Sequence, residues 1–504
     1  TANNYASKIG YDILKSGGTV ADASVAVQLT LGLVEPQSSG LGGGIFLTYF
    51  DKKTNKVLSF EGREKAPKNL KESVFLHKDG KPKKFFDAAI GGSSVGVPAT
   101  LKTLFLFHKK FGKLEWNEVI KPVVNLSSKG FIPPKRLVNA IKKEKFLFEL
   151  SPDSIYNQVK ENPKIKFINE NYTKTLIKIS KNISSFYNGE IAKDIVLKIN
   201  KSKNPGNMTL DDIKNYNPEI NDALCYKLRS GYKICGPNLP SSGTICIIKA
   251  FVLYEHLYKK NLKKPDLQQI LDILNFVYHV RDNYLGDPKF VSIDIERHIN
   301  EKEILRDFNN FKKKKSVISR NNLQKTFNST THFTLIDKYN NVLSATSSIE
   351  NSFGSRLFTN GFFLNNQLTD FSFKKKDNSK VPLKNLPKGE KRPLSSMSPM
   401  IVFDTENKFL LTTGSPGGKA IISYVFKSLI SILFLNENIE KAIKKPNYVK
   451  INGKVFLEDK LLNNELDDKG TIRSLTSGIA IIKKIGKKYH ASADHRRDGT
   501  VMGN

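Results

Sequence analysis

The chain has 504 residues, of which 39% are hydrophobic and 26% are charged, and this composition excludes disordered, collagen-like and disulfide-scaffold proteins. Lys and Arg total 81 against 48 Asp and Glu, so the formal net charge is +33. Only 12 of the 81 basic residues are Arg, and no nucleic-acid-binding motif accompanies them. We therefore interpret the charge as a solvated Lys-rich surface and expect no nucleic-acid partner.

No run of about 18 apolar residues occurs, so we expect no membrane span. The chain starts at Thr1 without the charged and apolar regions of a signal peptide. We expect such a segment to be either absent or already removed.

The first 35 residues predict two helices. Apolar residues recur at helical spacing over residues 5–14, and Gly17 and Gly18 follow as a stop signal. Residues 20–33 are almost wholly apolar and predict a helix buried between other elements. The glycine-rich residues 40–44 lack the ending of a phosphate loop. They predict a tight turn into two strands, at residues 45–50 and 56–60.

Helical patterns dominate from about residue 98 to 310, and a loop at residues 235–244 interrupts them. Three cysteines lie in this part without His at metal-ligand spacing, so we expect no zinc site. They are Cys225, Cys235 and Cys246. A single disulfide stays open as an alternative, but ordinary buried thiols are the favoured interpretation. Residues 311–328 are polar, basic and aperiodic and predict an exposed flexible connector.

After the connector the apolar pattern alternates with period two. Residues 331–337 and 342–347 predict one hairpin, and residues 400–403 and 409–413 predict a second. The second hairpin ends in glycine-rich residues 414–418, which open an apolar helix at 420–435.

The connector delivers Ser329 and Thr330 to the start of a strand. A Thr hydroxyl is a poor nucleophile unless a base lies beside it. A cut before Thr330 would create an α-amino group with a pKa of about 7.7–8.0, which suits a general base. Taken alone, this tripeptide with Thr331 and His332 is more often an ordinary strand start.

Eight ordered motifs change that balance. They occupy residues 17–18 with 22–23, 35–44, 63–67, 235–243, 330–332, 364–367 with 370–372, 392–399 and 414–418. Through them the chain resembles the gamma-glutamyltranspeptidase family along nearly its whole length. The resemblance implies an N-terminal nucleophile hydrolase of the α+β class, built as a four-layer αββα sandwich. It also implies self-cleavage between Ser329 and Thr330.

The expected products are a large subunit, residues 1–329, which includes the connector at about 311–329, and a small catalytic subunit, residues 330–504. The two would stay associated as one αββα domain. The family implies Thr330 as the nucleophile and Ser348, where Thr is usual, as the hydroxyl that orients it. Gly417 and Gly418 lie at a strand-to-helix junction, where backbone N–H groups face incoming negative charge, and resemble the oxyanion hole.

The γ-glutamyl group carries an α-carboxylate and an α-ammonium. By resemblance, Arg63 would bind the carboxylate with Ser395 and Ser396 as further donors. The ammonium would be accepted by three residues, Glu350, Gln367 and Asp370. No metal or cofactor is implied.

Three departures from the family pattern stand out. Glu350 occupies a position that is often Asn, which adds a carboxylate near the ammonium. Residues 371–394 are rich in Lys and lack Tyr, where many bacterial members carry an aromatic lid loop. Within residues 493–497, His495 stands where Pro is usual, and we assign no catalytic meaning to this departure.

The leading hypothesis is an autoprocessed gamma-glutamyltransferase and glutathione hydrolase, periplasmic or secreted, that acts through a γ-glutamyl-Thr ester. Its partners would be glutathione and other γ-glutamyl compounds, with water, amino acids or peptides as acceptors. One alternative is a same-fold acylase or amidase for another short dicarboxylic acyl group. Another is a processing-dead basic binding protein.

Overall fold

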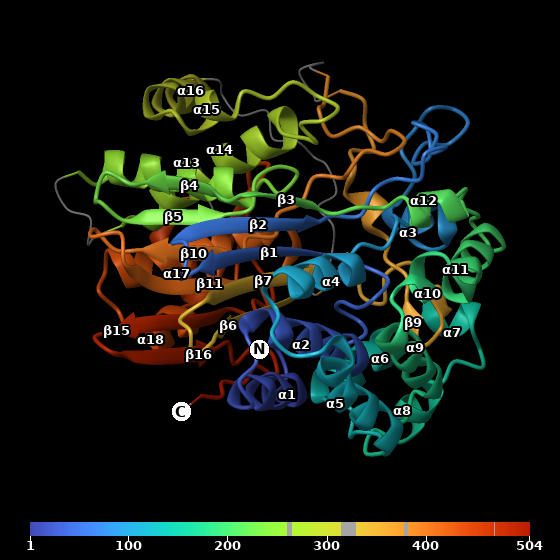
Figure 1. Ribbon diagram of the computed structural model, residues 1–504. Coiled ribbons are helices and arrows are strands. Elements are labelled where there is room, and N and C mark those ends of the chain that lie inside the picture. Colours follow the sequence, from blue (N-terminus) through green and yellow to red (C-terminus); the bar gives the residue numbers. More distant parts are fainter. Residues whose placement is uncertain (260–264, 314–328, 377–381, 468, 504) are drawn as a thin grey trace.

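The computed structural model describes residues 1–259, 265–313, 329–376, 382–467 and 469–503 (Figure 1). Its centre is a pair of stacked sheets. The first sheet has the antiparallel order β3 (Glu219–Asp222), β2 (Lys56–Gly62), β1 (Gly44–Asp51), β7 (Val342–Ser348), β6 (Thr331–Ile336). The second has the order β16 (Lys488–Ala493), β15 (Ala480–Ile485), β11 (Phe409–Gly414), β10 (Met400–Phe403), β5 (Lys233–Gly236), β4 (Leu224–Lys227).

Buried hydroxyl groups join the two sheets. Thr334 Oγ1 on β6 donates to Thr412 Oγ1 on β11 over 3.0 Å, and Ser344 Oγ on β7 donates to the Thr413 carbonyl over 3.0 Å. Because β6, β7 and β11 therefore lie face to face, the start of β6 and the end of β11 belong to one interface.

Helices cover the outer face of each sheet. On the first sheet, α2 (Val20–Val34) packs against β6 and β7, and α4 (Thr100–Phe111) packs against β1 and β2. On the second, α13 (Gly243–Leu257) packs against β5 and α17 (Ile421–Leu433) against β11, with α14 (Leu267–Tyr284) beside α13. All 15 residues of α2 are buried, which is why its apolar character runs around the whole helix. The predicted four-layer αββα class is confirmed.

Further helices gather to the right of the sheets in Figure 1 and share the core cluster of α2. They are α5 (Trp116–Lys129), α6 (Lys135–Lys143), α7 (Phe146–Leu150), α8 (Asn157–Glu161), α9 (Glu170–Lys181), α10 (Ser184–Tyr187), α11 (Glu190–Asn200) and α12 (Leu210–Lys214). The other helices are α1 (Asn4–Lys15), α3 (Phe85–Ala89), α15 (Ile295–Ile299), α16 (Glu301–Lys313) and α18 (Ile439–Lys444). Two small sheets are formed by β12 (Tyr448–Ile451), β13 (Lys454–Leu457) and β14 (Thr471–Ile472), and by β8 (Phe358–Thr359) and β9 (Phe362–Phe363).

The two N-terminal helices, the first strand pair and both predicted hairpins are confirmed, with ends within one or two residues. Three strands, β3, β4 and β5, were missed inside the region predicted as helical. Each has four residues, and β3 and β4 are edge strands with largely exposed side chains, so no alternating apolar pattern marks them.

The favoured interpretation of the cysteines as ordinary thiols was wrong for two of them. Cys225 on β4 and Cys235 on β5 are register partners and form a disulfide, while Cys246 is a free, buried thiol. Adjacent antiparallel strands bring the Cβ atoms of Cys225 and Cys235 close enough for a disulfide. The spacing of the cysteines in the sequence does not predict this, because it does not show which strands pair.

The connector also begins later than predicted. Residues 311–313 are the last turn of α16, which buries Ile304 and Phe308. The rest of the predicted connector, up to residue 328, lies outside the described residues.

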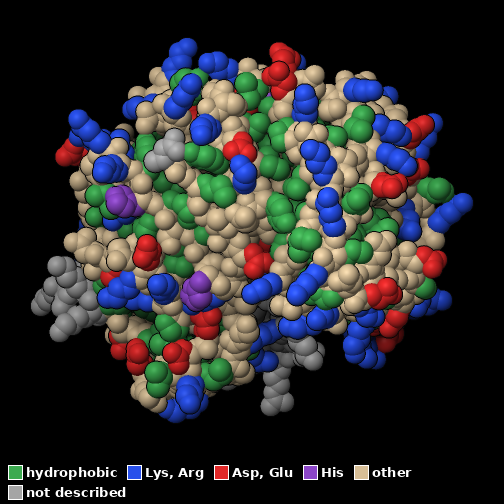
Figure 2. All heavy atoms as spheres, turned by 90° about the horizontal axis from the view of Figure 1, so that it is seen from below, with side chains coloured by type: hydrophobic (Ala, Val, Ile, Leu, Met, Phe, Trp, Pro, Cys, Tyr) green, Lys and Arg blue, Asp and Glu red, His purple; other side chains and the backbone are tan. Residues whose placement is uncertain are grey.

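On the face shown in Figure 2, Lys and Arg side chains are spread among acidic, apolar and uncharged groups. This distribution agrees with a solvated surface on that face. Among the described residues, no helix is both long and apolar enough to span a bilayer.

The disulfide makes a thiol count predictable. Denatured without reductant, the chain should react with a thiol reagent once, at Cys246, and three times after reduction. Cys246→Ser should remove the unreduced signal, and Cys225→Ser should raise it to two. Three reactive thiols without reduction would contradict the disulfide.

Candidate active site

Thr330 lies directly before β6, at the end of the first sheet. Its Oγ1 is 3.0 Å from Oγ of Ser348, the last residue of β7. The two meet because Thr331 pairs with Ser347 in the β6–β7 register. Ser348 Oγ accepts from the Glu350 N–H over 2.9 Å, so its own hydrogen is available to Thr330. The structure thus brings the predicted nucleophile and its predicted orienting hydroxyl together.

The backbone of Thr330 is strained. Its φ is +76°, a region that β-branched residues rarely occupy and that costs on the order of 1–3 kcal/mol. The Thr330 N–H donates to the Ser38 carbonyl over 3.2 Å, and Arg497 Nη1 donates to the Thr330 carbonyl over 2.8 Å. These two bonds hold the residue on both sides, so the strain is concentrated next to the Ser329–Thr330 bond.

The Ser38 turn is itself anchored. Arg136 Nη1 donates to Ser38 Oγ over 2.6 Å and to Glu35 Oε2 over 2.7 Å. Ser38 also accepts from the Ile349 N–H through its carbonyl, over 3.3 Å. The motif at residues 35–44 therefore supports Thr330 through Ser38, from the α2 side.

Gly417 and Gly418 form the turn between β11 and α17. Their φ angles are +137° and +58°, and a Cβ on Gly417 would lie 2.5 Å from Tyr424 Cε2, so the turn requires glycine. Neither of these glycine N–H groups donates a hydrogen bond to another described residue. Two such N–H groups at a helix start can receive an oxyanion.

His332 lies on β6, the strand that begins directly after Thr330, and it faces the end of β11. Its ring packs against Gly414, where a Cβ would lie 2.4 Å from Cε1, and its Nδ1 is 2.9 Å from Thr346 Oγ1. Burial lowers the pKa of His332 to about 3, so the ring is neutral. It acts as a packing support between β6 and β11.

Arg63 is fully buried behind the site. Its Nη2 pairs with Asp370 Oδ2 over 2.7 Å, and Nε and Nη2 donate to the carbonyls of Pro393 and Leu394 over 2.9 and 3.2 Å. Nη1 has no hydrogen-bond partner among the described residues and lies 3.6 Å from Glu64 Oε2. Arg63 and Asp370, expected at opposite ends of the ligand, are in direct contact, and carboxylate binding by Arg63 stays a prediction.

The acceptors expected for an ammonium surround Asp370. Gln367 Nε2 donates to Asp370 Oδ2 over 2.7 Å, which leaves the buried Gln367 Oε1 without a partner in the described part of the chain. Glu350 Oε2 accepts from Asn366 Nδ2 over 2.5 Å. Burial, with Asp370 next, raises the pKa of Glu350 to about 8, so this carboxyl keeps its proton to a higher pH than an exposed glutamate does.

Ser395 and Ser396 line the same region from the loop before β10. Ser395 Oγ accepts from the Met397 N–H over 3.1 Å, and Ser396 Oγ accepts from Arg281 Nε over 2.8 Å. Both hydroxyls keep a hydrogen to donate. The Ser242 N–H and Oγ bind the Ser395 carbonyl, so the predicted loop at residues 235–244 buttresses this segment.

Arg392 begins the motif at residues 392–399, but the sequence alone indicated no role for it. Its guanidinium binds Asp287 through Nη2 and Nε over 2.8 and 3.1 Å and reaches Glu219 from Nη1 over 2.8 Å. This buried cluster fixes the backbone at Pro393 and Leu394, whose carbonyls bind Arg63. The role of Arg392 could not be predicted because the sequence shows that the residue is charged but not that it is buried or which carboxylates it binds.

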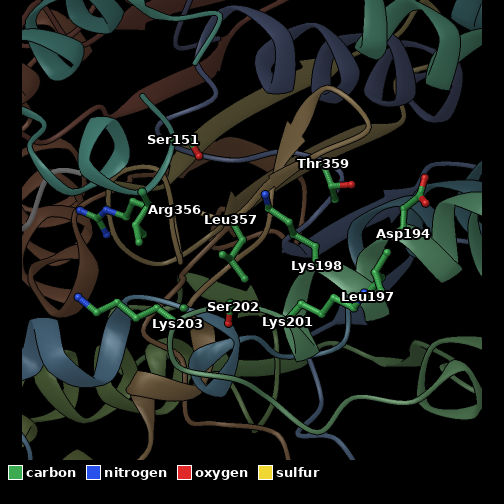
Figure 3. Close-up of a pocket in the computed structure, with 12 residues that line it drawn as sticks. Ser151, Asp194, Leu197, Lys198, Lys201, Ser202, Lys203, Arg356, Leu357 and Thr359 are labelled. Carbon is green, nitrogen blue, oxygen red and sulfur yellow. The ribbon is translucent and has the colours of Figure 1, made fainter. Parts of the chain in front are cut away.

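A cavity of about 440 Å³ lies elsewhere, between α11 and the segment around β8 (Figure 3). Its basic lining is formed by Lys198, Lys201, Lys203 and Arg356. None of the predicted site residues lines it. It is therefore separate from the Thr330 site.

Comparison with known proteins agrees with the family resemblance of the sequence motifs over nearly the whole chain. The family model for gamma-glutamyltranspeptidase matches residues 6–504. The chain belongs to the gamma-glutamyltranspeptidase family.

Two curated relatives in this family are similar over most of their length. The glutathione hydrolase proenzyme of Bacillus subtilis is 33% identical over 88% of this chain and 79% of its own. That of Escherichia coli is 31% identical with the same shares. The solved cephalosporin acylase of Bacillus halodurans has a TM-score of 0.81 at 19% identity, covering 100% of this chain and 94% of its own, which shows the shared fold.

The raised pKa of Glu350 gives this family member a testable pH dependence. Glutamate, used as a competitive inhibitor, should bind about tenfold more tightly as the pH rises through about 8, because the ionised carboxylate attracts the α-ammonium. The inhibition constant is measured against pH for the native chain and Glu350→Gln. The gain should vanish in the variant, whereas other titrating groups affect both proteins. Parallel pH profiles would contradict the role.

Proposed function

We propose that this chain is an autoprocessed gamma-glutamyltransferase that also hydrolyses glutathione and related γ-glutamyl amides. The observation that carries the proposal is the strained Thr330 facing Ser348. Behind it lie Arg63 Nη1 and Gln367 Oε1, which have no hydrogen-bond partner in the described part of the chain. Family membership supports the same conclusion.

The proposed products of self-cleavage are residues 1–329 and 330–504. Strand pairing supports their continued association, because β1 pairs with β7 and β5 pairs with β10 across that division. Each sheet thus contains strands from both pieces, and separating them would break both sheets.

Donor recognition follows from charge complementarity. Arg63 Nη1, with the hydroxyls of Ser395 and Ser396, would bind the α-carboxylate of the γ-glutamyl group. Gln367 Oε1, together with the Asp370 and Glu350 carboxyls, would bind the α-ammonium. Arg63 Nη1 and Gln367 Oε1, which lack partners among the described residues, would then form hydrogen bonds with the donor. This gain is the physical reason for selectivity toward γ-glutamyl donors.

Turnover would use the same Thr330 after cleavage. Its Oγ attacks the γ-amide carbonyl while its new α-amine accepts the proton, and the leaving amine takes that proton as the γ-glutamyl ester forms. The N–H groups of Gly417 and Gly418 would stabilise the oxyanion. Water or an amino acid then attacks the ester and restores Thr330.

We place this activity outside the cytoplasm, in the periplasm or secreted. The Cys225–Cys235 disulfide supports that location, since such bonds persist in oxidising compartments.

The same-fold acylase remains the enzyme alternative, given the likeness to cephalosporin acylase. Asp370 and Glu350 argue for a donor with an α-ammonium. A panel of glutathione, glutamine and glutaryl amides separates the two, because a glutaryl group lacks the ammonium. Preference for glutaryl amides would favour the acylase.

Thr330→Ala should abolish both self-cleavage and hydrolysis of a γ-glutamyl anilide, because it removes the only proposed nucleophile. A denaturing gel and N-terminal sequencing check this, with native protein giving a smaller fragment that begins Thr-Thr-His. Thr331→Ala is the matched control, since the buried Thr331 Oγ1 bonds to no described residue and its loss leaves Thr330 intact. An intact, inactive native chain would favour the processing-dead binding protein.

Arg63→Lys should raise KM for γ-glutamyl donors about ten- to hundredfold, with a smaller effect on kcat, because a charge-assisted hydrogen bond is lost. Steady-state kinetics measure both constants. Arg306→Lys, at an exposed arginine that pairs with Glu303, should leave KM unchanged. An unaltered KM in Arg63→Lys would count against carboxylate binding there.

A further inference from the structure

Arg497 lies against the Ser329–Thr330 bond. Its Nη1 donates to the Thr330 carbonyl over 2.8 Å, and its Nη2 reaches the Ser329 carbonyl oxygen at 3.5 Å and the Thr476 carbonyl at 3.2 Å. The Ser329 carbonyl is the one that Thr330 would attack in self-cleavage. Sequence reasoning assigned no role to this arginine.

This guanidinium is buried without a direct counter-ion. Arg497 is 6% exposed, no carboxylate of the described chain lies within ion-pair distance, and Nε has no hydrogen-bond partner there. The adjacent Arg496, by contrast, pairs with Glu458 and Asp494. Burial first, and Arg136 second, lower the pKa of Arg497.

A buried charge without a partner destabilises the folded chain. Glu35 and Asp494 offset part of this cost through space, without touching the guanidinium. The folded chain therefore keeps a buried, only partly compensated guanidinium beside the Ser329 carbonyl, where it would stabilise negative charge.

Self-cleavage creates negative charge at that carbonyl. Thr330 Oγ bonds to the Ser329 carbonyl carbon, whose oxygen becomes an oxyanion. The carbon–nitrogen bond then breaks, and the proton lost by Oγ ends on the Thr330 nitrogen. Water hydrolyses the resulting ester, which leaves a Ser329 carboxylate and restores the Thr330 hydroxyl.

We infer that Arg497 is a catalytic residue of self-cleavage, whose Nη2 stabilises the oxyanion formed on the Ser329 carbonyl. This inference rests on the cleavage site of the proposed function. It assigns separate oxyanion donors to the two reactions: Arg497 for the chain's own carbonyl, and Gly417 with Gly418 for the donor amide. The product carboxylate of Ser329 would form beside the guanidinium and supply its missing counter-ion.

The test compares self-cleavage rates of full-length chains in a pulse–chase followed on denaturing gels. Arg497→Gln should slow cleavage about a hundredfold, the usual effect of losing one oxyanion donor. The matched control is Arg306→Gln, at an exposed arginine on α16 whose ion pairs are with Glu303 and Asp307 and which does not contact the Ser329 carbonyl. It should cleave within about threefold of the native rate.

Chemical rescue separates chemistry from folding. Millimolar guanidinium should restore cleavage to Arg497→Ala at least tenfold while leaving Thr330→Ala uncut. The melting temperature of uncut Arg497→Ala should match that of uncut Thr330→Ala. Slow cleavage with a lowered melting temperature and no rescue would assign Arg497 a merely structural role and overturn the inference.

The remaining outcomes are distinguishable. Cleavage before Thr330 at the native rate in Arg497→Gln overturns this inference and leaves the proposed function standing. A native chain that is cut elsewhere, or not at all, overturns both.

Discussion

The positive φ of Thr330 is the constraint on which the rest of the site depends. A β-branched residue adopts this conformation only when its surroundings impose it, and here the Ser38 carbonyl and Arg497 hold it on either side. The conformation keeps the Thr330 hydroxyl against Ser348. Arg136 holds both Ser38 and buried Glu35, so a motif far from Thr330 in sequence acts on Thr330 through its backbone.

Buried arginines organise the structure around the candidate active site. Arg63 binds two backbone carbonyls and Asp370, and Arg392 holds that backbone through Asp287. These contacts join residues on both sides of the Ser329–Thr330 bond, as the two sheets do. A protein that cuts its own chain needs such shared structure, because its site must survive the loss of a covalent link.

Much of the fold was predictable where the pattern is local. The helix Val20–Val34 is apolar all round, and the hairpins around residues 340 and 406 alternate with a clear turn. The edge strands at residues 219–222 and 224–227 and the Cys225–Cys235 bond were not predicted, since four-residue strands with largely exposed side chains have no period to read. Pairing with distant strands decides their structure.

The sequence by itself determined the family, the αββα class and the residue types of the site, because nucleophile, glycine turn and charged groups lie in short ordered motifs. Only the tertiary structure decided how those groups act. The Arg63–Asp370 contact, the raised pKa of Glu350 and the burial of Arg497 without an ion-pair partner among the described residues depend on the folded chain and on partners that are distant in sequence. Burial changes the energy of a charge far more than its neighbours in the chain do, and burial is a property of the folded chain.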